Sequence, residues 1–214
     1  MKTQVDNCFN CLSPIKSNIL SSNRLVTERA TVAINKILGK AQHGYCEKCI
    51  SPLATQVRDV FAENDRFLNQ HIGHIPILTT HNPYQWAYMP VSIVTGQIVI
   101  GTGVISEFKS SLTDFFGEAS NSFAEKIAMG EKNIFAQLRK KVLQMDCDAV
   151  IATDIDYAEL GSLKNMIMVC ASGTAVKIKN VDILGENAII ITKLKESFKM
   201  VLLINEYKDS LVSY

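Results

Sequence analysis

Two short cysteine motifs near the amino terminus constrain this chain more than any other feature. "CFNC" contains Cys8 and Cys11, "CEKC" contains Cys46 and Cys49, and 34 residues separate the two motifs. Each CxxC turn can aim two sulfurs at one point, so two such turns can supply the four thiolates of a tetrahedral zinc site. Among common cytosolic metals, zinc suits four soft sulfur ligands best, ahead of iron and copper(I). We therefore predict that the four cysteines bind a structural Zn²⁺ ion.

Other roles for these cysteines are less favoured. A thioredoxin-type redox pair is typical of a CxxC that follows a strand in a βαβ pattern, and neither motif does so. Four unrelated reduced thiols remain the simplest alternative. A four-sulfur site has no open coordination position, which zinc catalysis requires. We expect the ion to hold a small module together, with metal binding and folding coupled.

The residues around the motifs predict two helices. "SSNRLVTERATVAINKILGK" begins with Ser and Asn as candidate caps, continues with apolar residues at helical spacing, and reaches Gly39 as a stop. After the second motif, Ser51 could cap a helix with Pro52 at its first position. This order of knuckle, insert, knuckle and helix resembles treble-clef zinc modules. "NQHIGHIP" then breaks the pattern, which places the module and its linker helix in residues 1–73.

Residues 74–180 have the pattern of an α+β domain. Residues 77–80 and 86–103 are rich in strand-forming side chains. We expect a short helix over residues 106–117 and a long amphipathic helix from about Ser122 to Met145. "AVIATDIDY" and "MIMVCASGTAVKIK" then predict a hairpin, in which Gly173 permits close backbone packing or a bulge. The order ββααββ indicates a sandwich with helices on one face of the sheet.

Four segments of this domain resemble one known family. They are "VTGQIVIG", "FKSSLTDFFGEAS", "CDAVIATDIDYAELG" and "MIMVCASGTAVKI", and together they span roughly residues 77–179. The family is YbjQ, whose members are often labelled as heavy-metal-binding proteins. The resemblance implies a compact α+β domain that assembles into a ring, usually a pentamer. It implies no reaction, because the biochemical role of the family is poorly defined.

The family label invites a second metal site in this domain. Asp154 and Asp156 share one face of the predicted strand. A turn centred near Ser162 would place Asp154 opposite Cys170 and Asp156 opposite Met168, a mixed set of ligands suited to a soft metal. A register slip of one residue would remove this cluster. The simpler interpretation is that the aspartates face solvent or a channel of the oligomer, so Asp154, Asp156 and Cys170 are weaker candidates.

Little in the sequence indicates an enzyme. His71, His74 and His81 could supply three imidazoles, but they lie in the linker and lack the i,i+4 spacing of a helical zinc pair. The chain has no GxSxG elbow, no Walker loop and no complete dinucleotide fingerprint. We lean towards a protein without catalytic activity, with a pocket between subunits as the remaining possibility for an enzyme.

The charge and hydropathy of the sequence limit the partners and the location that we expect for the protein. The net charge of +1 comes from 22 basic and 21 acidic residues, which gives no general attraction to nucleic acid or to an anionic membrane. The sequence shows no signal-peptide pattern and no apolar run long enough for a transmembrane helix. We expect a cytoplasmic protein. Residues 181–214 predict an apolar carboxyl-terminal helical extension, which we expect to pack against this domain, a sister subunit or a partner. Attachment to a membrane surface through Lys193, Lys195 and Lys199 is the alternative.

Two functional hypotheses follow from these patterns. In the first, the YbjQ-like domain forms a homo-oligomeric ring that displays the zinc module for docking of a protein partner. In the second, the protein is a sensor or buffer that binds exchangeable heavy metal. Nucleic-acid binding through the zinc module is disfavoured, because residues 1–70 carry mixed charge.

Overall fold

The computed structural model of the chain describes residues 6–18, 21–100, 123–159 and 166–212. It forms two compact units, Met1–Gln70 with Glu196–Tyr214 and His71–Lys195, which we call the cysteine unit and the sheet unit. The α+β class predicted from sequence is confirmed. The domain boundaries expected at residues 73 and 180 stay a prediction. The two units differ from that expectation, because each contains part of the carboxyl-terminal helix.

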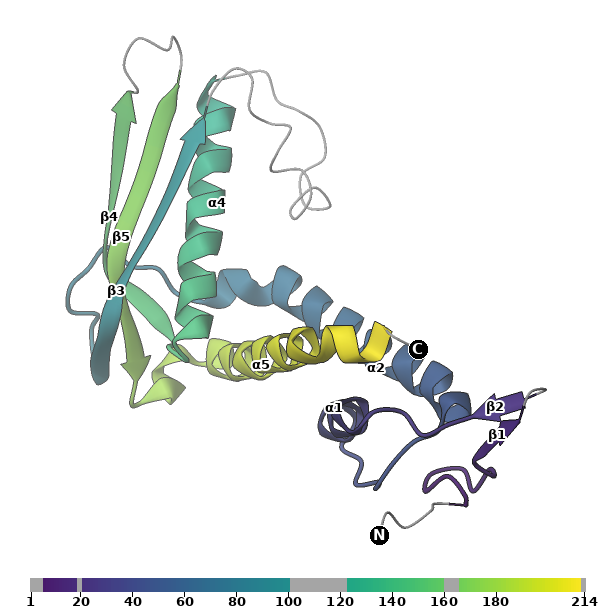
Figure 1. Cartoon of the computed structure of the whole chain (residues 1–214). Coiled ribbons are helices and arrows are strands. Elements are labelled where there is room, and N and C mark those ends of the chain that lie inside the picture. The colour runs from purple at the N-terminus through teal and green to yellow at the C-terminus, as the bar shows by residue number, and fades with distance from the viewer. Residues whose placement is uncertain (1–5, 19–20, 101–122, 160–165, 213–214) are drawn as a thin grey trace. The chain divides into compact units, whose positions relative to one another are not determined.

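The elements follow one another in this order: β1 (Lys16–Asn18), β2 (Ser21–Asn23), α1 (Glu28–Leu38), α2 (Glu47–His71), η1 (Ile72–His74), β3 (Tyr88–Ile100), α4 (Phe123–Gln144), β4 (Ala149–Glu159), β5 (Ile167–Ile178), η3 (Val181–Leu184) and α5 (Glu186–Val212) (Figure 1). The short helix expected over residues 106–117 lies outside the described residues. The long helix expected from Ser122 to Met145 is confirmed as α4.

Both predicted helices of the cysteine unit exist, but each begins at a different residue from the one expected. In α1 the cap is Thr27, whose side chain accepts a hydrogen bond from the Ala30 N–H. The Ser and Asn cap candidates are instead part of β2, which pairs with β1. Gly39 ends α1 in the left-handed conformation at φ 62°, as its position predicted.

The second helix, α2, begins before the residues expected to start it. Pro52 lies inside the helix rather than at its first position. The reason is tertiary: Leu25 forms a β-bridge with Cys46, and the Glu47 N–H donates to the Arg24 carbonyl at 2.9 Å. These contacts orient the backbone at Glu47, so the helix starts within the second cysteine motif.

The apolar core of the cysteine unit includes the far end of the chain. Ala30, Ile34 and Ile37 of α1 pack with Leu53 and other residues of α2. Ile204, Tyr207 and Leu211 of α5 are buried in the same cluster. Lys36 of α1 donates a hydrogen bond to the Tyr207 hydroxyl at 3.1 Å. The end of α5 is therefore a structural part of the cysteine unit.

The sheet unit is built on three antiparallel strands in the order β3–β5–β4, with α4 along one face (Figure 1). Residues 77–80, which the sequence predicted as a strand, run beside β4. Ile77 forms a parallel bridge with Val150, and the Leu78 N–H donates to the Val150 carbonyl at 2.9 Å. The second predicted strand is β3, a single continuous strand within its described length.

The predicted hairpin of β4 and β5 is confirmed, but its expected register is wrong by two residues. Asp156 lies opposite Cys170, Asp154 opposite Ser172, and Ala158 opposite Met168. Side chains alternate between faces with a period of two, so a two-residue shift keeps every side chain on its own face. The apolar pattern was therefore equally compatible with both registers.

Gly173 of β5 explains how the two strands approach beside an irregularity in β4. The pairing shifts between Ile151 and Asp154, and Ala152 takes a positive φ of 52° there. A Cβ added to Gly173 would lie 2.5 Å from Val150 Cγ1 and 3.2 Å from the Ile151 carbonyl oxygen. The close backbone packing expected from the sequence is confirmed.

We expect Gly173→Ala to lower the free energy of unfolding of the sheet unit by about 1–3 kcal/mol, the usual cost of overpacking a close contact. Trp86, the only tryptophan of the chain, belongs to this unit and can report its unfolding in urea through its fluorescence. Gly73→Ala is the control, because a Cβ at Gly73 would meet nothing within 4 Å. Equal stability of the two variants would contradict the prediction.

Candidate metal centre

The first cysteine pair lies on a tight knuckle held by backbone hydrogen bonds. The Cys8 N–H donates to the Ser13 carbonyl at 2.8 Å, and the Leu12 N–H donates to the Cys8 carbonyl at 3.0 Å. Leu12 takes a left-handed φ of 59°, which closes the turn. The Asn10 N–H lies inside the turn and donates to Cys8 Sγ at 3.4 Å. This geometry directs the sulfurs of Cys8 and Cys11 towards the same point.

The second pair is positioned by a strand contact on one side and by α2 on the other. Cys46 pairs with Leu25, and the Val26 N–H donates to the Tyr45 carbonyl at 2.9 Å. The Cys49 N–H donates to the Cys46 carbonyl at 2.9 Å, which forms the first turn of α2. The segment between the motifs therefore returns the chain to the first knuckle, although the motifs are far apart in sequence.

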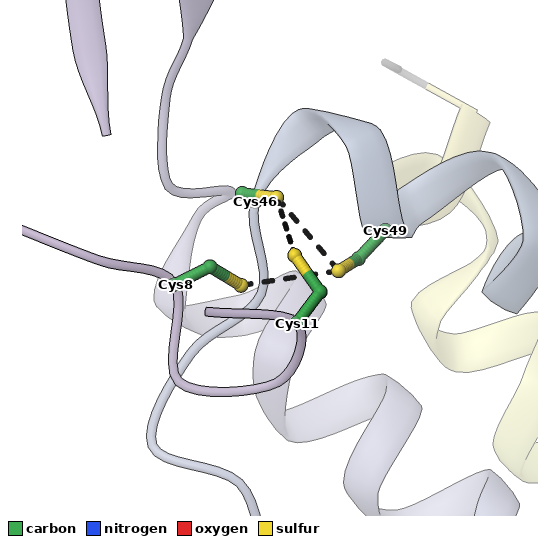
Figure 2. Close-up of side chains that lie close together, drawn as sticks. All are labelled: Cys8, Cys11, Cys46 and Cys49. Atoms are coloured by element: carbon green, nitrogen blue, oxygen red, sulfur yellow. Dashed lines mark hydrogen bonds between the residues drawn. The ribbon is translucent and has the colours of Figure 1, made fainter. Parts of the chain in front are cut away.

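The four predicted cysteines meet at one place, as Figure 2 shows. Their Sγ atoms all lie within 4.8 Å of one another. The Sγ–Sγ distance is 3.8 Å for Cys8 and Cys49, and 3.7 Å both from Cys46 to Cys11 and from Cys46 to Cys49. A tetrahedron with zinc–sulfur bonds of about 2.3 Å has edges of about 3.8 Å. The cluster thus has the dimensions of a four-thiolate metal site.

The four thiols differ in their surroundings. Cys8 and Cys46 are fully buried and Cys49 is 5% exposed, whereas Cys11 is exposed to solvent. Burial raises the pKa of Cys49 to about 12, and hydrogen bonds with Ser13 lower the pKa of Cys11 to about 6. A bound cation favours the thiolate form of every ligand and would release the protons that remain.

Asn10 supports this cluster, and the sequence reasoning did not identify it. Besides its backbone contact with Cys8, its side-chain amide donates to Cys49 Sγ at 3.3 Å. Such donors around a metal orient the ligands and stabilise their charge. The sequence places Asn10, a side chain that can donate a hydrogen bond, inside the first CxxC motif. Its acceptor, Cys49, lies on another element, so this motif alone could not predict the contact.

The weaker candidates do not form a comparable cluster. Asp156 and Cys170 are opposite each other on β4 and β5, while Asp154 is exposed and faces Ser172. The His71 and His74 rings lie 5.4 Å apart, with His74 Nδ1 at 3.0 Å from the His71 carbonyl. Within the described ranges, the only group of three or more histidine, cysteine or acidic side chains close enough to share an ion is the cysteine cluster. A second metal site stays a prediction.

Among the residues that the structure describes, no helix combines the length and the apolar character needed to cross a membrane.

Comparisons with known proteins match the sheet unit. A YbjQ family model, described as "Putative heavy-metal-binding", matches residues 77–179. A UPF0145 protein of Acetivibrio thermocellus is 39% identical over 87 residues, which cover 41% of this chain and 82% of that protein. A UPF0145 protein of Anoxybacillus flavithermus is 33% identical over 105 residues, which cover 48% of this chain and 98% of that protein.

One solved structure is also similar, a protein of unknown function of the DUF74 family from Pediococcus pentosaceus. It is 17% identical, with a TM-score of 0.32, and the match covers 48% of this chain and 96% of that one.

Proposed function

The chain belongs to the YbjQ family, and from this premise we propose that it is a non-enzymatic metal protein of the cytoplasm. In this proposal Cys8, Cys11, Cys46 and Cys49 bind one structural Zn²⁺ ion per chain. The sheet units assemble into a homo-oligomeric ring that displays the cysteine units to a protein partner. The single observation that carries the proposal is the convergence of four sulfurs at tetrahedral distances.

The chemistry of the ligand set favours zinc over other ions. All four candidate ligands are sulfur, and four thiolates complete a tetrahedral shell without a position for water. Three of the four sulfurs are nearly excluded from solvent, as expected for an ion that holds a fold together. The heavy-metal label of the family agrees with a soft ligand set, although the matched residues 77–179 lie outside the cysteine unit.

The outer face of the sheet supports assembly through the sheet unit. On β3, Val94 is buried and Gly96 faces Ile134 of α4, whereas Ile93 and Val99 alternate with them and are 70% and 41% exposed. Exposed large apolar side chains on an open sheet face support an interface there, and Thr95, Gln97 and Asp154 make this face mixed in polarity. In a ring, each weak contact with a partner would be repeated, which raises avidity without any new contact.

The edge of β3 is less available for pairing with another strand. Gln137 of α4 donates to the Gln97 carbonyl at 3.5 Å, and Lys141 donates to the Thr95 carbonyl. These side chains occupy two carbonyls that an added strand would require. The proposed assembly therefore uses the outer face of the sheet rather than the edge of β3.

Metal analysis of the purified full chain tests the proposed site. We expect about one equivalent of zinc per chain and, after replacement by Co²⁺, the absorption spectrum of tetrahedral thiolate coordination. Cys8→Ser should lose the metal, because it removes a fully buried ligand. Cys170→Ser is the control and should retain it. Metal that survives in Cys8→Ser and disappears in Cys170→Ser would place the site in the sheet unit instead.

Native mass measurement tests the proposed ring. The full chain should have the mass of a homo-oligomer, and Ile93→Glu should reduce that mass by placing a charge on the proposed interface. Ile189→Glu is the matched control, because Ile189 is an isoleucine of α5 that is 75% exposed. A monomeric wild-type chain, or equal dissociation of the two variants, would contradict the proposal.

A further inference from the structure

A cavity of about 390 Å³ adjoins the cysteine cluster within the cysteine unit. Cys11 and Cys49 form part of its wall, together with Asn10 and Ser13 of the first knuckle. Its volume lies in the range of sites that take small molecules. The cavity therefore provides space for a small ligand directly beside two of the four sulfurs.

The charge of the cavity wall is one-sided. Lys40, just after α1, and Lys48, in the first turn of α2, both line it. No acidic side chain of the described residues is part of the wall. The two ammonium groups favour an anionic ligand, and they do so at the side of the cluster where Cys11 is exposed.

The four sulfurs are also unequal in their access to this ligand. Cys8 and Cys46 are fully buried and Cys49 is 5% exposed, so an incoming group can reach Cys11 most directly. Cys11 follows the turn that Asn10 stabilises, whereas Cys49 accepts a hydrogen bond from the Asn10 side chain. Loss of Cys11 from the metal would leave the three better-protected sulfurs in place.

We propose that the cavity receives a small anionic thiol, whose sulfur replaces Cys11 Sγ on the bound metal. This inference rests on the proposed function, because it requires an ion held by the four cysteines. The ion would then be held by three cysteines and the incoming thiol, with Lys40 and Lys48 as the groups that select the charge of that ligand.

The exchange needs no redox partner. The incoming thiol loses its proton and forms a sulfur–metal bond as the bond from Cys11 Sγ to the metal breaks. That proton passes to water and Cys11 leaves as a thiolate, so one metal–sulfur bond forms as one breaks and no change of oxidation state occurs. A thiol is the expected ligand because thiolate sulfur matches the preference of a soft metal.

A competing role for the lysines must be separated from this one. A metal with four thiolates carries excess negative charge, and in the competing role Lys40 and Lys48 serve only to offset it. In that case their removal would change the retention of the metal with every incoming ligand. Selection of the ligand predicts instead an effect that depends on the charge of the thiol.

The experiment uses the full chain loaded with zinc and a chromogenic chelator that traps released metal. Release is measured with glutathione, which is anionic, with 2-mercaptoethanol, which is neutral, and with cysteamine, which is cationic, at equal thiolate concentrations. Lys40→Gln/Lys48→Gln should lower the glutathione-dependent rate about three- to tenfold at low ionic strength, as expected for two nearby charges in water. The rate with 2-mercaptoethanol should not change, and Lys208→Gln, an exposed lysine of α5, is the control.

Alkylation of the zinc-loaded chain during exchange locates the sulfur that leaves. Peptide mass spectrometry should find Cys11 labelled first, and first labelling of Cys8 or Cys46 would overturn the inference. Equal effects of the lysine substitutions on all three thiols, or no effect, would also overturn it. A chain that binds no zinc would refute the proposed function as well, whereas a zinc-loaded chain that ignores thiol charge refutes only this inference.

Discussion

Replacing Cys46 with serine is expected to abolish metal binding and to unfold the cysteine unit while the sheet unit stays folded. Cys46 is fully buried, and its Sγ lies 3.7 Å from the Sγ atoms of both Cys11 and Cys49. Structural zinc contributes about 10–16 kcal/mol to the folding of small zinc peptides. That amount is comparable to or larger than the whole stability of an ordinary domain, about 5–15 kcal/mol. A small unit that loses this contribution should not remain folded.

Two probes separate the units in this experiment. Hydrogen exchange should show loss of protection in α1 and also near Tyr207 of α5, because both belong to the core of the cysteine unit. Trp86 fluorescence should be unchanged, since that residue belongs to the sheet unit. Cys170→Ser, at a half-buried position of β5, should have the same zinc content and the same hydrogen-exchange protection as the wild type. Full protection of α1 in a metal-free Cys46→Ser chain would contradict the coupling.

The second large effect is expected at an ion pair in the sheet unit, where Lys195→Met should lower the free energy of unfolding by about 2–4 kcal/mol. Lys195 contacts the Asp148 carboxylate and donates to the Asp146 carbonyl at 3.1 Å. The side chains of Lys195 and Asp148 are only 18% and 10% exposed. Loss of one partner leaves a carboxylate with little access to water, and breaking such buried pairs typically costs about 3–5 kcal/mol.

The second oxygen of Asp148 ties this pair to the sheet, since it accepts a hydrogen bond from the Ile178 N–H at 2.8 Å. Urea unfolding followed by Trp86 fluorescence measures the loss. Lys179→Met, at an exposed position just after β5, is the control and should change the stability by less than about 0.5 kcal/mol. The double variant Lys195→Met/Asp148→Asn should recover part of the loss. A Lys195→Met chain as stable as the control would show that water still solvates the carboxylate.

Some features of this protein could be predicted because they depend on local sequence. The apolar spacing of α4, the strand pattern of β4 and β5, and the stop at Gly39 each follow from residues within a few positions of one another. The cysteine cluster is the one long-range contact that could be predicted. It was accessible because few arrangements other than a shared metal use two CxxC motifs in one chain.

Other features could not be predicted because they depend on contacts between distant residues. The start of α2 is set by the pairing of Leu25 with Cys46. The burial of Tyr207 beside α1 requires the end of α5 to return to the amino-terminal unit. The side-chain contact of Asn10 with Cys49 also appears only after the two knuckles have met.

The amino-acid sequence by itself determined the four-cysteine cluster, the α+β class and the family, because these depend on residue types, on their spacing and on local periodicity. Only the tertiary structure decided the hairpin register, the inclusion of α5 in the cysteine unit, and the cavity of Lys40 and Lys48 beside Cys11. The physical reason is that a two-residue shift preserves strand faces, and that an apolar helix packs equally well on many apolar surfaces. Such choices are made by the sum of many weak contacts across the fold, which no short stretch of sequence contains.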